Sequence, residues 1–353
     1  MATALAGLAT TIIGAGNTTQ IGINSSLAKQ IGHFLPASAV SFLGGTLLLT
    51  IVNGVLYVRA RSMSKLQQAR WEDFSVVELC GGFIGTCTLV ASTALSPYLG
   101  FTVGSTISSA AQCVSSLLVD GIGLLGMPRR SLSRQRILGA VVVVAGCIGS
   151  SRSVMNVPSV GASTAVSSAR LIGLALLYFV VRSGQPFQSA LNRRLADRLP
   201  LRSMAACVSF AAGSIGVCSC CALLFARRPD AWRAVVDGFT RRSASSYGLH
   251  SMRWWMPLGG IFGATQVTST IFLVPQLSAT VYFNCMTVGQ LLCSMIQDSI
   301  GAFGNGKRPI TALRLVSVGL TYIGTVLTQE PFGRQPQSAH ERDGIAQKLR
   351  AEN

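Results

Sequence analysis

The sequence contains two related copies of one hydrophobic unit, and this internal repeat constrains the fold more than any other feature. When residues 20–45 are shifted by 168 positions without a gap, nine of them meet an identical residue. When residues 81–146 are shifted by 178 positions, a second and longer series of identities follows. Duplicated hydrophobic units of this size are typical of secondary transporters rather than of soluble repeat proteins.

Composition indicates a membrane protein built from helices. Only 12% of the residues are charged and the mean hydropathy is +0.49, whereas about 25% of residues are charged in soluble domains. A helix needs about 20 mainly apolar residues to cross the hydrocarbon layer. An all-α polytopic membrane protein is therefore expected, with ten spans near residues 2–23, 35–58, 75–96, 98–121, 135–151, 171–191, 203–226, 254–274, 276–298 and 313–329.

The spans divide into two five-helix halves. Residues 1–151 form the first half, a linker rich in Ser, Val and Ala covers 152–169, and residues 170–330 form the second half. Because five crossings is an odd number, the second copy must enter the membrane from the opposite side, which makes the halves inverted repeats. Such repeats place a substrate site near the midplane between them. Residues 331–353 are polar and are expected to form a disordered tail.

The positive charges agree with inversion only in part. With the N-terminus in the cytoplasm, the arginines of the first half gather on the cytoplasmic side, as the positive-inside rule requires. The loop after the seventh span departs from that rule, but long loops bias orientation less, so both termini are expected in the cytoplasm. Because the arginines flank apolar spans, the net charge of +17 indicates contact with anionic membrane lipids rather than with nucleic acid.

Several strings, taken in order, resemble a known family. They are Gln-Ile-Gly-Ile-Asn at 20–24, "AVSFLGGTLLL" from Ala39, "GGFIG" from Gly81, Pro97 with Leu99-Gly100, and "AAQCVSSLLVDGIGLLG" from Ala110. Together they resemble the YdcZ-like branch of the drug/metabolite transporter superfamily, over nearly all of residues 10–150 and more weakly over 175–328. The resemblance implies a ten-helix carrier, formed in relatives by two five-helix chains or, as here, by one fused chain. A homodimer of this chain stays open.

Polar side chains form stripes on the first and sixth spans. Because an unsatisfied polar group in hydrocarbon costs several kcal/mol, such stripes turn toward the interior of the bundle. A kink is expected at Pro186 in the sixth span. The two helices are therefore predicted to line the transport pathway and to bind a small-molecule substrate through Asn17, Gln20, Asn24, Arg182, Gln185, Gln188 and Asn192.

Arg182 is the most informative single position. Its repeat equivalent is Gly14, near the middle of a span, where a charge costs about 2.5–3.5 kcal/mol or more. Two interpretations stay open. Arg182 contacts an anionic group of the substrate, or it makes an internal ion pair or hydrogen bonds to helix carbonyls.

The fourth and ninth spans carry matched polar residues, and the third span carries one carboxylate. Gln112 and Gln290 are candidates for the substrate cavity. Asp120 and Asp298 are candidate proton-coupling groups, since burial can raise the pKa of a carboxylate. We favour a structural role for both, because they lie near helix ends. Glu78, whose repeat equivalent is Met256, has either a functional role or an interfacial one.

Other classes of function find little support. The sequence has no phosphate-binding Gly-Lys-Ser/Thr loop, and its three histidines are dispersed, so no cofactor, metal site or catalytic triad is expected. The favoured hypothesis is a secondary carrier for a small polar or anionic metabolite, with an exporter implied by the resemblance. A non-transporting scaffold or receptor and a channel are the alternatives.

Overall fold

The computed structural model describes residues 2–64, 66, 75–126, 129, 132–155, 168–240 and 253–328, and every regular element in them is a helix. The C-terminal tail predicted over 331–353 and most of the predicted linker, residues 156–167, lie outside these residues. The first half comprises α1 (Ala2–Ile31), α2 (Phe34–Ser62), η2 (Val76–Leu79), α3 (Cys80–Leu99), α4 (Phe101–Ile122), η3 (Leu124–Gly126) and α5 (Arg134–Met155).

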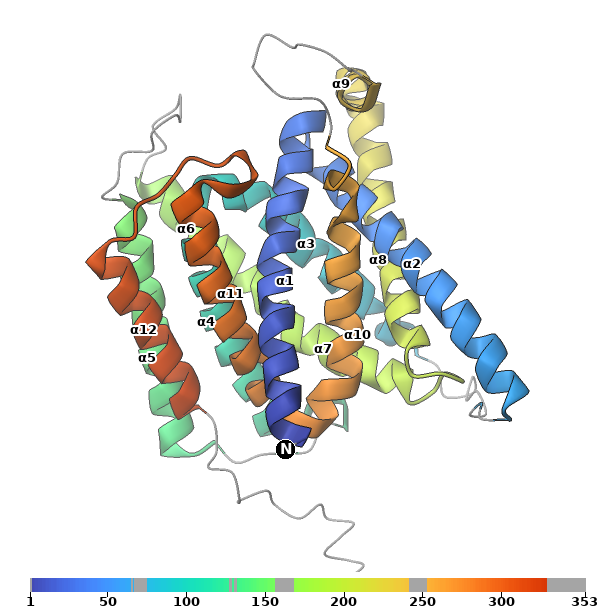
Figure 1. Ribbon diagram of the computed structural model, residues 1–353, viewed down its shortest axis with the longest axis horizontal. Coiled ribbons are helices and arrows are strands. Elements are labelled where there is room, and N and C mark those ends of the chain that lie inside the picture. Colours follow the sequence, from blue (N-terminus) through green and yellow to red (C-terminus); the bar gives the residue numbers. More distant parts are fainter. Residues whose placement is uncertain are drawn as a thin grey trace, which may run out of the picture.

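The second half repeats this order, with one helix divided and one added. It comprises α6 (Ser168–Arg182), α7 (Gly184–Ala196), α8 (Met204–Arg227), α9 (Pro229–Thr240), η4 (Met256–Leu258), α10 (Gly259–Leu277), α11 (Ala279–Ile300), η5 (Ala302–Gly304) and α12 (Ala312–Leu327). The long helices run side by side in one bundle (Figure 1).

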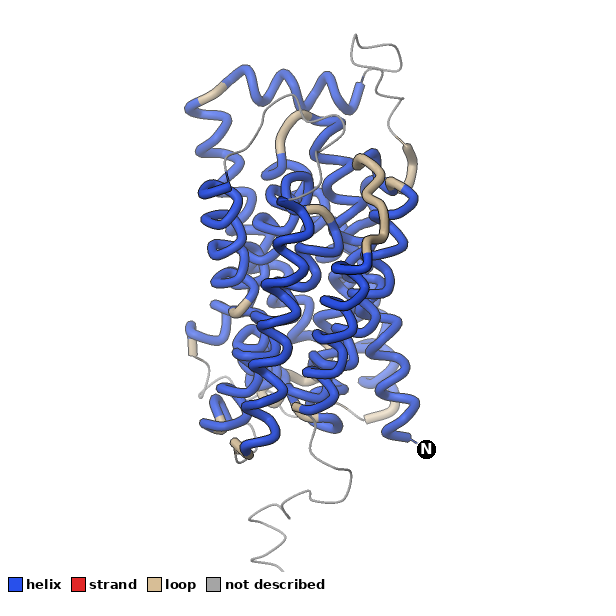
Figure 2. Tube along the Cα trace, turned by 90° about the vertical axis from the view of Figure 1, so that its left-hand side faces the viewer, coloured by secondary structure: helices blue, strands red, loops and turns tan. Residues whose placement is uncertain are grey.

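Each of the ten predicted spans has a counterpart in the bundle. The sixth span is divided into α6 and α7 around Ser183, because Pro186 has no N–H to donate to the carbonyl of Arg182. The loop after the seventh span also contains α9, which the hydropathy pattern does not indicate. This amphipathic helix lies across the end of the bundle (Figure 2), with Val235 buried and Trp232 exposed.

The turns of one half recur in the other. Gly100, between α3 and α4, and Ser278, between α10 and α11, both have φ of +80°. Gly123 and Gly301 both end their helices in the left-handed conformation, which glycine adopts without steric cost. The repeat seen in the sequence is therefore a repeat of backbone geometry.

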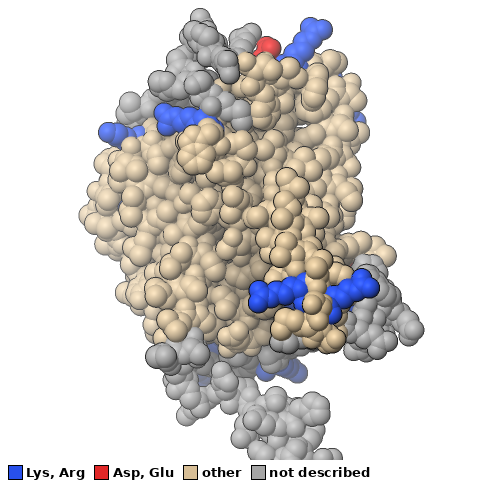
Figure 3. All heavy atoms as spheres, turned by 45° about the vertical axis from the view of Figure 1, so that its right-hand side comes forward, with Lys and Arg blue, Asp and Glu red and all other residues tan. Residues whose placement is uncertain are grey.

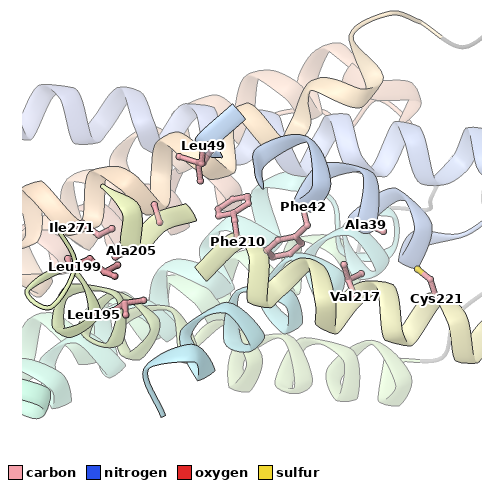
Figure 4. Close-up of a cluster of buried hydrophobic side chains, with 13 residues drawn as sticks. Ala39, Phe42, Leu49, Leu195, Leu199, Ala205, Phe210, Val217, Cys221 and Ile271 are labelled. Carbon is pink, nitrogen blue, oxygen red and sulfur yellow. The ribbon is translucent and has the colours of Figure 1, made fainter. Parts of the chain in front are cut away.

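Helices α2 and α8, which are repeat equivalents, pack against each other in opposite directions. The rings of Phe42 and Phe210 lie 5.2 Å apart, and the hydroxyls of Thr46 and Ser214 lie 2.9 Å apart. One turn further along α2, Thr50 meets Cys207, which is earlier in α8. Figure 4 shows Phe42 and Phe210 together in the apolar cluster at this contact.

Helices α4 and α11 are also antiparallel, and two aspartates connect their opposite ends. Asp120, at the end of α4, accepts hydrogen bonds from the backbone N–H of Thr280 in the first turn of α11, at 3.1 Å, and from its hydroxyl. Asp298, at the end of α11, accepts hydrogen bonds from the N–H groups of Phe101 and Thr102 in the first turn of α4, at 3.0 and 2.9 Å. Equivalent helices run in opposite directions, so the halves are inverted.

Each of these aspartates also pairs with an arginine of the following helix. Arg136 of α5 lies 3.3 Å from Asp120, and Arg314 of α12 lies 2.5 Å from Asp298. All four side chains are at least 95% buried. A buried carboxylate is stable only when it is paired and hydrogen-bonded, and here the partners come from both halves.

The outer surface of the bundle is apolar. Large hydrophobic side chains are exposed along α2, among them Leu47, Ile51 and Val55. In the view of Figure 3, lysine and arginine side chains gather toward the two ends and leave an uncharged band between them. In the part of the chain that the structure describes, five helical segments are long and apolar enough to span a membrane, at 34–62, 76–99, 204–227, 256–277 and 279–300. Others, such as α1 and α4, are less apolar because they bury many polar side chains in the centre.

Exchanging Asp298 for Asn tests the role of the reciprocal contacts. The substitution leaves Arg314 without its carboxylate in the interior, and breaking a buried ion pair costs about 3–5 kcal/mol. We expect the unfolding temperature of the detergent-solubilised protein to fall by several degrees. Asp197→Asn is the control, because Asp197 pairs with Arg202 on the surface, where an ion pair contributes about 0–1 kcal/mol. Equal shifts for the two variants would contradict this assignment.

Candidate substrate site

A cavity lies where the two halves meet. The space not filled by protein atoms is about 460 Å³ when the open sides of the cavity are included. The cavity is lined by residues of α1, α2, α3, α7, α8 and α10 together with Arg182 at the end of α6. The polar lining includes five residues predicted from the stripes on the first and sixth spans: Asn17, Gln20, Arg182, Gln185 and Gln188. Phe42, Phe210, Leu89 and Val267 contribute apolar wall.

Repeated glycines make room for two of the glutamines. The side chain of Gln20 lies over Gly263 of α10, and that of Gln188 lies over Gly85 of α3; a Cβ at either glycine would be 2.5 or 2.6 Å from the glutamine Nε2. Because a side chain there would collide with the glutamine, the small residues do more than allow helices to pack closely. They leave room for one amide from each half at the cavity wall.

Arg182 is buried with 3% of its surface exposed. Its Nε donates to the hydroxyl of Ser108 at 2.6 Å, and its terminal nitrogens lie 3.5 Å from the hydroxyl of Ser92 and from Oδ1 of Asn17. Its guanidinium also stands 5.9 Å from the centre of the Tyr178 ring. Among the described residues no carboxylate lies within 4.0 Å of Arg182. Its partners are side-chain hydroxyls and an amide rather than helix carbonyls or an acid.

Asn17 connects the guanidinium with the amides of the second half. Its Nδ2 donates to Oε1 of Gln266, and its Oδ1 accepts from Nε2 of Gln290 at 3.3 Å. In the symmetry-related contact, Gln112 of the first half donates to Oε1 of Gln185 of the second half at 2.7 Å. Gln112 and Gln290 therefore do not line the cavity. They lie one layer behind it and hold two residues that do.

Asn24 and Asn192 lie one turn beyond the cavity. They are buried, and each packs against a glycine of the other half, Gly259 and Gly81 respectively. The stripes predicted for the two spans thus continue past the cavity. Their last members, Asn24 and Asn192, contact the glycines of the other half and do not line the cavity.

The three candidate coupling carboxylates lie outside the cavity lining. Asp120 and Asp298 accept hydrogen bonds from helix N-termini and pair with arginines, as described above. Glu78 is 1% exposed and lies 3.1 Å from Arg194 and 3.0 Å from Arg198 at the end of α7. The repeat equivalent of Glu78 at the opposite end of the bundle is Met256, which is apolar. It packs in a cluster with Leu27, Ile31, Ala37 and Val235.

Some cavity residues are absent from the sequence prediction. Gln266 lines the cavity opposite Gln188, and Thr88 and Ser92 add hydroxyls from α3. Gln266 is the repeat equivalent of Thr88. Both residues are polar but they are not identical, so a search for identical residues in the two halves misses them. Within the described part of the chain, no group of three or more His, Cys, Asp or Glu side chains is placed to hold a metal ion.

Comparison with known proteins agrees with this architecture. The family model described as "Putative inner membrane exporter, YdcZ" matches residues 5–149 and again residues 173–327, one match for each half. No curated protein matches the sequence. A solved structure titled "Crystal structure of protein" is similar in fold, with a TM-score of 0.52 and 15% sequence identity over 91% of this chain and 96% of its own.

The two family matches together cover most of the chain, and each coincides with one of the inverted halves. This protein is therefore an integral, multi-pass membrane protein that belongs to the YdcZ family of membrane exporters.

Proposed function

We propose that this protein is a secondary active carrier that moves a small polar anion across the membrane by alternating access. The observation that carries the proposal is Arg182, a buried cation that faces the cavity with no carboxylate beside it among the described residues. Taking such a charge out of water is costly unless an opposite charge compensates it. A bound anion supplies that compensation.

The position of Arg182 supports binding rather than a purely structural role. The sixth span is interrupted directly after it, and α7 begins at Gly184 beside the cavity. Interrupted helices at the midplane of transporters commonly direct the positive end of a half-helix toward an anionic substrate. The guanidinium of Arg182 would attract an anion and repel a cationic substrate.

Two groups of contacts beyond the ends of the cavity differ in chemistry and are the candidates for its two closures. At one end Glu78 ties the start of α3 to the end of α7 through Arg194 and Arg198. At the other end an apolar cluster around Met256 joins α1, α2, α9 and η4. We propose that each closure separates in turn, while the glycine contacts between halves allow the rocking motion that inverted repeats permit.

Exchange of anions by purified protein in liposomes tests the proposal. Counterflow of radiolabelled lactate, gluconate, succinate and phosphate is compared with counterflow of the cation choline, and at least one anion is expected to exchange while choline does not. Arg182→Gln should lower anion counterflow tenfold or more, because it removes a charge-assisted contact worth about 1.5–3 kcal/mol.

Arg202→Gln is the matched control, since Arg202 lies in a surface ion pair, and we expect it to keep normal counterflow. A well-folded Arg182→Gln protein that exchanges anions normally, or a wild-type protein that exchanges only choline, would refute the proposal. Flux without counterflow would indicate a channel, and no flux of any solute would indicate a scaffold or receptor.

Breaking the ionic closure is expected to expose the pathway from one side. Ser189, on α7 between the cavity and Glu78, is buried and is similar in size to cysteine. In a background without other reactive cysteines, Ser189→Cys should react several-fold faster with a membrane-impermeant maleimide when Glu78→Gln is added. Asp197→Asn, which removes a surface ion pair, should leave the rate unchanged. An unaltered rate with Glu78→Gln would show that this ion cluster does not close the cavity.

A further inference from the structure

We infer that the anion accepted by this cavity carries several hydroxyl groups, as a polyhydroxylated monocarboxylate of the sugar-acid class does. This inference rests on the proposed function and narrows its substrate class. It follows from the polar groups of the cavity wall other than Arg182.

Three glutamines leave hydrogen-bonding groups free at the cavity. Gln20 and Gln188 make no side-chain hydrogen bond with the described residues, and Nε2 of Gln266 has only the sulfur of Met286 at 3.9 Å. All three side chains are more than 90% buried. Since they line the cavity, their amide groups are turned toward whatever fills it.

The chemistry of the carboxamide limits the substrate. Gln20 and Gln188 offer both N–H donors and a carbonyl acceptor, whereas Gln266 offers its N–H donors, because its carbonyl already accepts from Asn17. A hydroxyl group both donates and accepts, so hydroxyls satisfy both ends of an amide. A second carboxylate only accepts hydrogen bonds and would meet the carbonyl oxygens unfavourably. An apolar chain would leave these buried amides without hydrogen-bond partners, which is unfavourable.

The rest of the wall fits the same class of molecule. Thr88 and Ser92 add hydroxyls on the side of α3, and Arg182 provides the single positive charge for the carboxylate. The rings of Phe42 and Phe210, 5.2 Å apart, form an apolar surface at the contact of the two halves. A polyol chain presents C–H groups to such a surface and hydroxyls to the amides.

Four probes of similar size separate the requirements for charge and for hydroxyls. Gluconate has one carboxylate and several hydroxyls, hexanoate has the carboxylate alone, glutarate has two carboxylates, and glucose has hydroxyls without charge. In liposomes loaded with unlabelled gluconate, we expect uptake of labelled gluconate at least tenfold faster than that of the other three.

Substitution of the amides should remove this preference. Gln266→Leu and Gln188→Leu, tested separately, should raise the KM for gluconate tenfold or more and bring its uptake closer to that of hexanoate. Gln276→Leu is the control, because Gln276 lies on the exposed side of the same helix α10 as Gln266. It should leave the KM unchanged.

The outcomes distinguish this inference from the proposed function. Uptake of hexanoate or glutarate equal to that of gluconate, still dependent on Arg182, would overturn the hydroxyl requirement and leave the anion carrier intact. Preference for gluconate that survives both glutamine substitutions would also overturn it. Uptake of glucose alone would refute both. Exchange of lactate, succinate or phosphate but not of gluconate would overturn only this inference.

Discussion

Asp120 and Asp298 each bind the first turn of a helix in the opposite half, and the rest of the structure depends on these two reciprocal contacts. Each carboxylate lies at the end of one helix, accepts hydrogen bonds from the first turn of the equivalent helix in the other half, and pairs with an arginine of the next helix. A carboxylate at a helix N-terminus compensates unpaired N–H groups and the positive end of the helix dipole. Because each half supplies this group to the other, the halves are held antiparallel.

The cavity is a consequence of that arrangement. Inversion brings Gln20 of α1 over Gly263 of α10 and, by the same symmetry, Gln188 of α7 over Gly85 of α3. The exact symmetry is broken at Arg182, whose equivalent is Gly14. Gly14 packs against the backbone of Met286 in α11, with no space even for a Cβ. One half therefore supplies a positive charge at this position and the other supplies close helix packing. As a result, the charge lies on one side of the cavity only.

Much of the fold and part of the site follow from the sequence. The spans, the repeat and the kink before Pro186 are local or periodic features, and hydropathy with helix geometry is enough to find them. A helical wheel indicates which side of a span faces inward but not how deep each residue lies. For that reason Asn24 shares a stripe with cavity residues yet lies beyond the cavity, and Gln290 faces the interior of the bundle but lies behind the cavity. Asp298 pairs with Arg314 at the same spacing in the sequence as Asp120 pairs with Arg136. This spacing is present in the sequence, but it indicates ion pairs only once the structure shows which residues are in contact. Gln266 needs the fold, because its repeat equivalent is a threonine.

The central claim is that the inverted halves enclose one pathway that opens to each side in turn. The most direct measurement is the labelling of Gln188→Cys, in a background without other reactive cysteines, by a membrane-impermeant reagent added to either face of oriented vesicles. The account predicts labelling from both faces, with protection when an exchanged anion is bound. Labelling from one face only, or none from either face in a protein that still transports, would contradict it.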